Sequence, residues 1–476
     1  MKVRVLGHAC LYIEHLDVRL LIDPWLIGSC YWRSWWNYPE VPADLLEQIH
    51  PTHIYITHLH WDHYHGPSLR RFLGDDPVIL LPKSPTVRMV KDMRSDFRFS
   101  RIRELSHGKK YSLGRDFAIY SYQFNPVFID SSLVVESANA CLFNANDSKV
   151  FGLSLRQIIQ RHPQFDLVFR SHSSASADPY CVDGVDPWST TRSPRDYALD
   201  FLAFAEASRA KFAIPFASSH VYLHKDTETF NQYYNSPQKV MDEFRKLSSP
   251  HFRCVQMPPG SSWSDDAGFK LVEHDYSQIN HHIQDLQTKH HSTMSKHYNR
   301  EKSASLNEAS FTRYFTGFSR AIHFPLKHLR FAFFASASIH GDIPGTLAIV
   351  DTKRRETSFF YDVAYSPALI AEHKLDFILR VNPLVLNDCT KKSMFNTFAA
   401  SKLLRIQPNG SSKRYLSFFS LADLYENDGL PLWRSLEPRQ LINRLRRFRE
   451  PLDVAWFVYK TKLRRSSLSS LWGTVE

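Results

Sequence analysis

The sequence lacks the features of a secreted or membrane-spanning protein. It has only six cysteines in 476 residues, and no two of them form a Cys-x-x-Cys pair. A disulfide framework is therefore not expected, and the thiols suit a reducing compartment. No apolar run approaches the roughly 18 residues of a spanning helix, and the N-terminus has no long apolar stretch, so we expect neither a membrane span nor a signal peptide. These absences favour a cytoplasmic protein.

The composition is that of a soluble globular protein with a basic surplus. Hydrophobic residues make up 43% and charged residues 22%, and the length fits two or three domains. The net charge of +11 favours an anionic partner. No nucleic-acid motif or aromatic–basic interleaving is present, so we expect an anionic small molecule and no nucleic acid. The oligomeric state does not follow from the sequence.

The first part of the chain alternates strand and helix patterns, which predicts a layered α/β domain over 1–280. The segment 281–304 is polar and contains five histidines between 281 and 297. Such a tract can bind metal, but a solvated linker or surface helix is the favoured interpretation. Strand and helix patterns resume over 305–476, which predicts a smaller α+β domain.

The strongest motif is His58-Leu59-His60-Trp61-Asp62-His63, directly after a β-branched strand over 53–57. Three imidazoles and a carboxylate at a strand end can point into one cavity, and imidazole suits zinc and iron while aspartate adds a harder ligand. We expect His58 and His60 to hold one metal ion, and Asp62 and His63 a second. Asp62 is also the candidate catalytic residue, because it can hold a metal-bound water.

This motif resembles the signature of the metallo-β-lactamase superfamily. The resemblance implies a four-layer αββα sandwich and a bridging aspartate after a later strand, for which Asp147 is the candidate. It also implies a last histidine after another core strand, and either His220 or His224 fits that position. The remaining ligand is usually a histidine, but the stretch 125–130 contains none. Asp130, or Asn125, must then serve, and a carboxylate there shifts the preference from zinc towards iron.

Several other stretches resemble the CMP-N-acetylneuraminate hydroxylase family, a branch of that superfamily. They are Gly7-His8-Ala9-Cys10, Asp23-Pro24-Trp25-Leu26-Ile27-Gly28, the Trp35-Trp36 pair, Asp130-Ser131 and Pro215-Phe216-Ala217. In this resemblance His224, not His220, falls on a family histidine. The C-terminal part is also similar to sterol-carrier α+β domains. The family's hydroxylases carry a Rieske domain, which needs paired Cys/His boxes; no cysteine here has such a histidine neighbour, so we expect no Rieske cluster in this chain.

Six other residues have weaker claims to support the metals or contact substrate. His8 can line the site, and Asp23 can fix the tautomer of a ligand imidazole. The tryptophans at 32, 35 and 36, including the Trp35-Trp36 pair, can form a stacking wall, although a packed lid is the more common role of such a loop. His172, which follows a strand over 166–171, is a further candidate.

Two mechanisms fit these residues. In the first, a diiron centre activates O₂ and hydroxylates an anionic, nucleotide-sugar-like molecule, with electrons from an external ferredoxin or reductase. In the second, two metal ions lower the pKa of a bridging water, and the resulting hydroxide cleaves a phosphodiester, lactone or amide. A metal-bound scaffold without turnover is the third interpretation.

Overall fold

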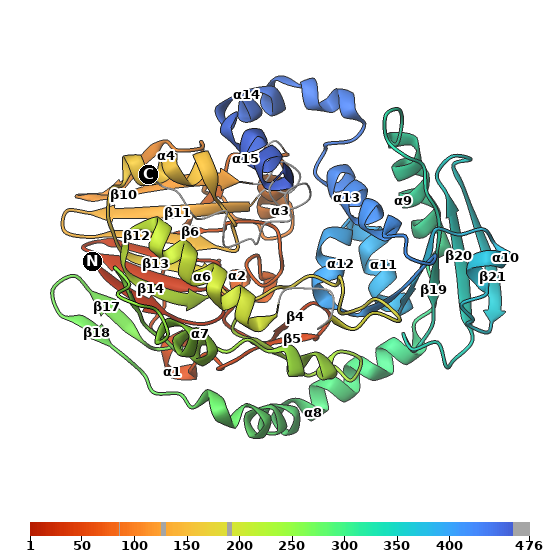
Figure 1. Ribbon diagram of the computed structural model, residues 1–476, viewed down its shortest axis with the longest axis horizontal. Helices are drawn as coiled ribbons and strands as arrows, with labels where there is room; N and C mark the ends of the chain where they lie inside the picture. The colour runs from red at the N-terminus through yellow and green to blue at the C-terminus, as the bar shows by residue number, and fades with distance from the viewer. Residues whose placement is uncertain (85, 125–129, 188–192, 460–476) are drawn as a thin grey trace.

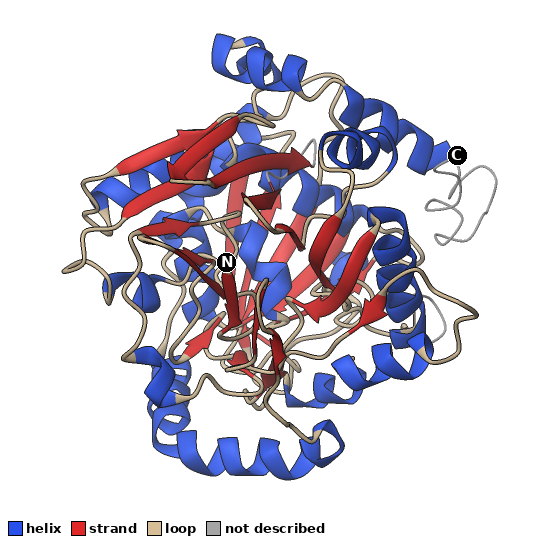
Figure 2. Ribbon diagram, turned by 90° about the vertical axis from the view of Figure 1, so that its left-hand side faces the viewer, coloured by secondary structure: helices blue, strands red, loops and turns tan. Residues whose placement is uncertain are grey.

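The computed structural model describes residues 1–84, 86–124, 130–187 and 193–459. Its first part contains two large sheets that face each other, with helices on both outer faces. Strands gather at the centre of the molecule and helices lie around them (Figure 2). The predicted four-layer αββα sandwich is thus confirmed.

The first sheet has eight strands in the order β18-β17-β1-β2-β3-β6-β7-β8. Strands β18 to β3 pair antiparallel, whereas β3, β6, β7 and β8 run parallel. The strands in chain order are β1 (Lys2–Val5), β2 (Leu11–His15), β3 (Val18–Ile22), β6 (His53–Tyr55), β7 (Val78–Pro82), β8 (Ile102–Leu105), β17 (Ser262–Ser264) and β18 (Gly268–Lys270).

The second sheet has seven strands in the order β16-β14-β13-β12-β11-β10-β9. Strands β9 to β12 pair antiparallel, and β12, β13, β14 and β16 run parallel. They are β9 (Lys110–Gly114), β10 (Phe117–Phe124), β11 (Asp130–Ser137), β12 (Cys141–Asn146), β13 (Phe165–Ser171), β14 (Ala210–Phe216) and β16 (Arg253–Cys254).

The apolar faces of these strands explain the layers. One buried cluster fills the space between the sheets, with residues such as Leu20, Leu133 and Ile214. A second cluster packs the outer face of the first sheet against α2 (Gly66–Arg70) and α3 (Arg88–Ser95), near the short α1 (Ala43–Leu46). A third packs the second sheet against α4 (Gly152–Arg161), α6 (Pro194–Ser208) and α7 (Pro237–Phe244). Each sheet is therefore covered on both faces, as parallel strands require.

A second unit follows, built on the five-stranded sheet β21-β20-β19-β22-β23. Its strands are β19 (Arg330–Ala335), β20 (Gly345–Asp351), β21 (Glu356–Val363), β22 (Phe377–Val381) and β23 (Leu404–Pro408). Its helices are α9 (Glu308–Ala321), α10 (Leu369–Glu372), α11 (Pro383–Lys392), α12 (Phe395–Ser401) and α13 (Arg414–Glu426). The α+β pattern agrees with the prediction, while the sterol-carrier resemblance stays a prediction.

The two units share one hydrophobic core. A small sheet of β4 (Ser29–Cys30), β5 (Trp35–Asn37) and β15 (His220–Tyr222) belongs to the first unit. Its residues Trp35 and Tyr222 lie in the same buried cluster as Phe315 and Phe333 of the second unit. The aromatic loop between β4 and β5 therefore lies against the second unit.

Two further segments join the units in ways that the sequence did not indicate. The polar segment predicted as a linker forms most of α8 (Ile279–Ser303), a 25-residue helix that runs along one edge of the molecule between the units (Figure 1). Helices α14 (Pro438–Arg446) and α15 (Arg449–Val458) return to the first sandwich, where Asp453 accepts hydrogen bonds from the backbone of Leu153 and Ser154. In the part of the chain that the structure describes, no helix is long and apolar enough to cross a membrane.

Candidate metal centre

The histidine motif follows β6, at the carboxyl end of the parallel strands of the first sheet. Such strand ends are the usual place for ligand sites in α/β folds. The backbone N–H groups of His63 and Tyr64 both donate to the carbonyl of His60, which turns the chain back after the strand. His60 and Asp62 thereby line a cavity of about 310 Å³, together with His8, Asp130, Asp147 and His220 from other elements.

The side chains form two overlapping groups of metal-ligand atoms. One consists of His58, His63 and Asp147, and the other of His8, Asp62 and His63. Nε2 of His63 lies 3.1 Å from Asp147 Oδ2 and 3.3 Å from Asp62 Oδ2, and Nε2 of His8 lies 3.0 Å from Asp62 Oδ2. Bonds of about 2.0–2.2 Å place the ligand atoms of one ion roughly 3 Å apart, so these spacings suit coordination.

His60 completes the cluster on the side of His58. Nε2 of His58 lies 2.9 Å from Nδ1 of His60. Two imidazole nitrogens at this distance either share a proton or bind the same ion. The structure thus brings together all four charged residues of the motif predicted from the sequence, with Asp147 beside them.

Asp23 sets the tautomer of two of these histidines. Its Oδ2 lies 2.8 Å from Nδ1 of His63 and also accepts a hydrogen bond of 2.7 Å from the hydroxyl of Thr57. Because that hydroxyl proton is given to Asp23, the Thr57 oxygen, 2.9 Å from Nδ1 of His58, accepts from this nitrogen. Both histidines then carry a proton on Nδ1, which leaves Nε2 as the ring nitrogen that can bind a metal ion.

The electrostatics favour an ionised Asp62 and a neutral His58, which are the states that ligands need. Burial opposes ionisation of Asp62, but the charge of His63 and hydrogen bonds from His63 and His8 outweigh it and hold the Asp62 pKa well below its usual range. The Tyr31 hydroxyl adds a hydrogen bond of 2.5 Å to the same carboxylate. For His58, burial and then the neighbouring His63 and His60 lower the pKa well below its ordinary value, so its imidazole is neutral. Burial opposes protonation of His63, but Asp62, Asp23 and Asp147 outweigh it and raise the His63 pKa well above its ordinary value, so a bound metal ion would displace the Nε2 proton.

The donor set also leaves lone pairs for a metal to satisfy. Among the described residues, Nδ1 of His8, Oδ1 of Asp130 and Nδ1 of His220 are buried and make no hydrogen bond. Buried polar atoms are normally paired, so their collection around one cavity calls for a ligand. The residues present therefore fit a metal centre.

The structure separates the two candidates for the last histidine. His220 lines the cavity and stacks on Trp35 with ring centroids 3.5 Å apart. His224 instead places Nε2 3.1 Å from both carboxylate oxygens of Glu301 on α8. The family resemblance thus pointed to the histidine that lies in a different cluster. His220 and His224 are only four positions apart, but their side chains lie in different parts of the protein.

Several other residues predicted for the site do not lie where the sequence analysis expected them. Asp130 lines the cavity, but it belongs to neither ligand group. Its Oδ1 lies 3.4 Å from Nδ1 of His58, whereas the other ring nitrogen of His58 faces His60. Asn125 lies outside the described residues. Nε2–H of His172 donates to the carbonyl of Asn235 (3.0 Å), and its backbone N–H donates to the Ser218 hydroxyl; His172 is absent from the cavity wall. Trp36 packs against His290 of α8, away from the cluster of candidate metal ligands.

Sequence reasoning undervalued His8 and did not identify Tyr31 or Lys149. His8 follows β1 and lies within ligand distance of Asp62, so it belongs with the candidate ligands, not merely in the cavity wall. Its signal was its place immediately after a strand end, next to Gly7. Tyr31 and Lys149 come from loops, and only the tertiary structure brings them to the cavity.

Comparison with known proteins agrees with this geometry. Residues 2–164 match the beta-lactamase superfamily domain. The chain is 40% identical over 91 residues to the cytidine monophosphate-N-acetylneuraminic acid hydroxylase of Pongo pygmaeus, which covers 19% of this chain and 16% of that protein. It is 30% identical over 263 residues to a putative Rieske 2Fe-2S iron-sulfur protein of Mycolicibacterium smegmatis, which covers 51% of this chain and 48% of that protein. The alignments thus span less than half the length of either relative.

Solved structures are more distant. A metallo hydrolase of Ignicoccus hospitalis is 14% identical, with a TM-score of 0.38, over 55% of this chain and 96% of its own. CmlA, a diiron β-hydroxylase from Streptomyces venezuelae, is 13% identical, with a TM-score of 0.36, over 54% and 52%. Because these identities and TM-scores are low, the fold assignment rests on the match of residues 2–164 and on the observed layers. Residues 2–164 match the beta-lactamase superfamily domain, and the first unit of this chain has the layers of the metallo-β-lactamase fold.

Proposed function

We propose that this chain is a dinuclear metalloenzyme that hydroxylates an anionic small molecule of the nucleotide-sugar type. The observation that carries the proposal is the cluster of His8, His58, His60 and His63 with Asp62 and Asp147 around one cavity. A donor set that mixes carboxylates with imidazoles suits iron as well as zinc. The similarity to proteins named as hydroxylases supports iron and oxygenation.

These six residues, with Nδ1 of His220 as a further candidate ligand, would hold the metal ions, and iron bound there would supply O₂ activation. Other residues of the chain would orient the metal ligands and close the wall of the cavity. Asp23 and Tyr31 fix the orientation of His63 and of Asp62. The stack of Trp35 on His220 closes one wall of the cavity.

The cavity mouth favours an anionic substrate. Lys149, an exposed residue two positions after Asp147, lines the cavity, and four residues of the segment 171–176 are serines that line it too. An ammonium group and hydroxyl donors suit a phosphate or carboxylate. Since none of the six cysteines has a histidine two or three positions later, we propose that a separate ferredoxin or reductase supplies the electrons.

Hydrolysis is the second candidate, and one observation favours it. Asp62 is held ionised beside the cavity by His8, His63 and Tyr31. An ionised carboxylate next to a metal site can hold and orient an attacking water. A phosphodiester, lactone or amide would be the substrate class.

Metal analysis decides between the two. The protein is purified from cells grown with both iron and zinc, and its metal content is measured by plasma mass spectrometry. About two iron ions per chain support the oxygenase, and O₂ consumption is then measured with added ferredoxin and reductase. About two zinc ions support the hydrolase. No metal after reconstitution overturns both, and full loading without turnover in either assay would leave a metal-bound scaffold.

A further inference from the structure

We propose that a second cavity, on the opposite side of the metal-binding loop, is a separate binding site for a flat aromatic anion. This inference does not depend on which reaction the metals perform. It rests on the shape of the cavity, its aromatic wall, two basic side chains without acidic partners, and its connection to the metal ligands.

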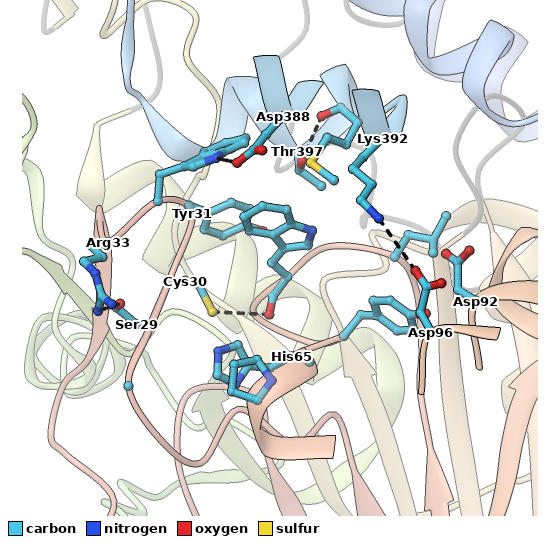
Figure 3. Close-up of a pocket in the computed structure, with 18 of the residues that line it drawn as sticks. Ser29, Cys30, Tyr31, Arg33, His65, Asp92, Asp96, Asp388, Lys392 and Thr397 are labelled. Carbon is cyan, nitrogen blue, oxygen red and sulfur yellow. Dashed lines mark hydrogen bonds and ion pairs between the residues drawn. The ribbon is translucent and has the colours of Figure 1, made fainter. Parts of the chain in front are cut away.

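The cavity has a volume of about 720 Å³, within the usual range for small-molecule sites. It lies where three parts of the chain meet: the loop before and after β4, the helix α3 with Asp92 and Asp96, and the helices α11 and α12 with Lys392 and Thr397 (Figure 3). Helix α8 adds His297 and Arg300. Sites between structural units are common for ligands, because each unit contributes one wall.

One wall is aromatic. Trp61 lies nearly parallel to Tyr31, with ring centroids 6.0 Å apart and an interplanar angle of 13°, and its centroid is 4.8 Å from that of Trp32. Trp61 is only partly buried, so its ring offers a free surface to the cavity. The three residues from Tyr31 to Arg33 all have positive φ, between 51° and 65°. Such backbone is costly for residues other than glycine, and it persists where the surroundings enforce it, often at ligand sites.

Most charged residues of the cavity have partners of their own. Among its basic residues, Arg88 lies 3.9 Å from Asp92, Lys392 lies 4.0 Å from Asp96, and Arg70 lies over the ring of Phe97. The acid Asp388 accepts a hydrogen bond from Trp32.

Arg33 and Arg300 differ from these residues. Within the described ranges, neither forms an ion pair with a carboxylate. The pKa of Arg33 is lowered, first by burial and then by the nearby charge of Arg300, so the two guanidinium groups are neighbours that repel each other. A bound phosphate, sulfate or carboxylate would relieve that repulsion and accept hydrogen bonds from both.

The metal-binding loop separates the two cavities. Leu59, Trp61 and His65 face the second cavity, whereas His60 and Asp62 face the metal cavity. Tyr31 lines both, and its hydroxyl donates to Asp62. A ligand that stacks on Trp61 would therefore contact the loop that carries the metal ligands without entering the metal cavity.

The test compares two probes with the same rings. The fluorescent 8-anilinonaphthalene-1-sulfonate carries rings and an anionic group, and N-phenyl-1-naphthylamine has these rings without the sulfonate. We expect the full chain to bind the sulfonate saturably with one site per chain, and more tightly than the uncharged probe. Arg300→Gln and Arg33→Gln should each weaken sulfonate binding, by about tenfold for the half-buried Arg33 and less for the exposed Arg300, and leave the uncharged probe unaffected.

Lys149→Gln is the matched control, because it removes a basic residue from the metal cavity alone. It should leave sulfonate binding unchanged. Equal binding of the two probes, unchanged sulfonate binding in both arginine variants, or loss of binding in Lys149→Gln would each overturn the proposal. Arg300 is exposed on α8, so its variant keeps the test valid even if Arg33→Gln does not fold.

Discussion

Two of the histidine and carboxylate groups in the described part of the chain differ in what their ring nitrogens face. The first is the metal cluster around His58, His63 and Asp147, and the second consists of His224, His297 and Glu301. In the first group the Nε2 atoms converge beside a cavity with unpaired polar atoms. In the second, Nε2 of His224 lies 3.1 Å from both oxygens of Glu301, and Nε2 of His297 lies 3.3 Å from one of them.

The partner of Nδ1 explains the difference. Nδ1 of His63 donates to the carboxylate of Asp23, so Nε2, which faces Asp147 and Asp62, is the nitrogen that can bind a metal ion. Nδ1 of His224 accepts a hydrogen bond of 3.1 Å from the backbone N–H of Asp226, so its proton lies on Nε2 and is donated to Glu301. The same residue types thus make a candidate metal site in one place and a hydrogen-bonded anchor for α8 in the other.

The largest effect should come from removing a ligand of the first group. His60→Ala and Asp147→Ala should each lose metal and lower turnover at least about 100-fold, because the remaining residues cannot complete the coordination. Metal content and activity are measured on the same preparation. Asp242→Ala, which removes an exposed carboxylate paired with Arg245, is the control and should change neither. A fully loaded and active His60→Ala variant would refute the site.

Asp23→Asn tests the role of the Nδ1 partner directly. The amide has the shape of the carboxylate but can donate to Nδ1 of His63, which would move the proton to Nε2. Metal affinity should fall by about 10–100-fold, measured by competition with a chelator. Asp166→Asn is the matched control, since Asp166 also accepts a backbone hydrogen bond, from Cys141, but lies outside the cavity. Equal affinities in the two variants would mean that Asp23 does not set the tautomer.

His220→Ala and His224→Ala should separate the two groups. His220 lines the metal cavity, so its variant should lose up to one metal ion per chain. His224→Ala should keep both ions and lower the free energy of unfolding by roughly 2–4 kcal/mol, because Glu301 is left buried with one partner fewer. Metal analysis and urea unfolding measure the two quantities. The reverse pattern would restore the assignment that the family resemblance implies.

The features that the sequence predicted are those that depend on residues close together along the chain. Short strand patterns located β6 and β13, and the histidine motif located the metal-binding loop, because both are local patterns. The polar composition of 281–304 did not distinguish a linker from a surface helix, because the burial of α8 depends on the first unit, through residues such as Ile283 and Leu286. Likewise, His220 and His224 have equal claims in the sequence, and only the contacts with Trp35 and Glu301 distinguish them.

The smallest effect should be a change in the pH dependence of stability when the second group loses its charge. Burial alone would raise the pKa of Glu301, but hydrogen bonds from His224 and His297 outweigh it and lower the pKa to about 2. A carboxylate with a lowered pKa stabilises the folded state above its ordinary pKa, and this contribution disappears as the pH falls towards 2. Glu301→Gln should therefore lower the free energy of unfolding by roughly 2–3 kcal/mol at pH 6, with the deficit shrinking below pH ~4.5. Glu228→Gln, which alters an exposed contact to Gln287 on the same helix, should leave the profile of the wild type unchanged. A deficit for Glu301→Gln that is constant from pH 6 to pH 3 would show that the carboxylate's shape, and not its charge, anchors α8.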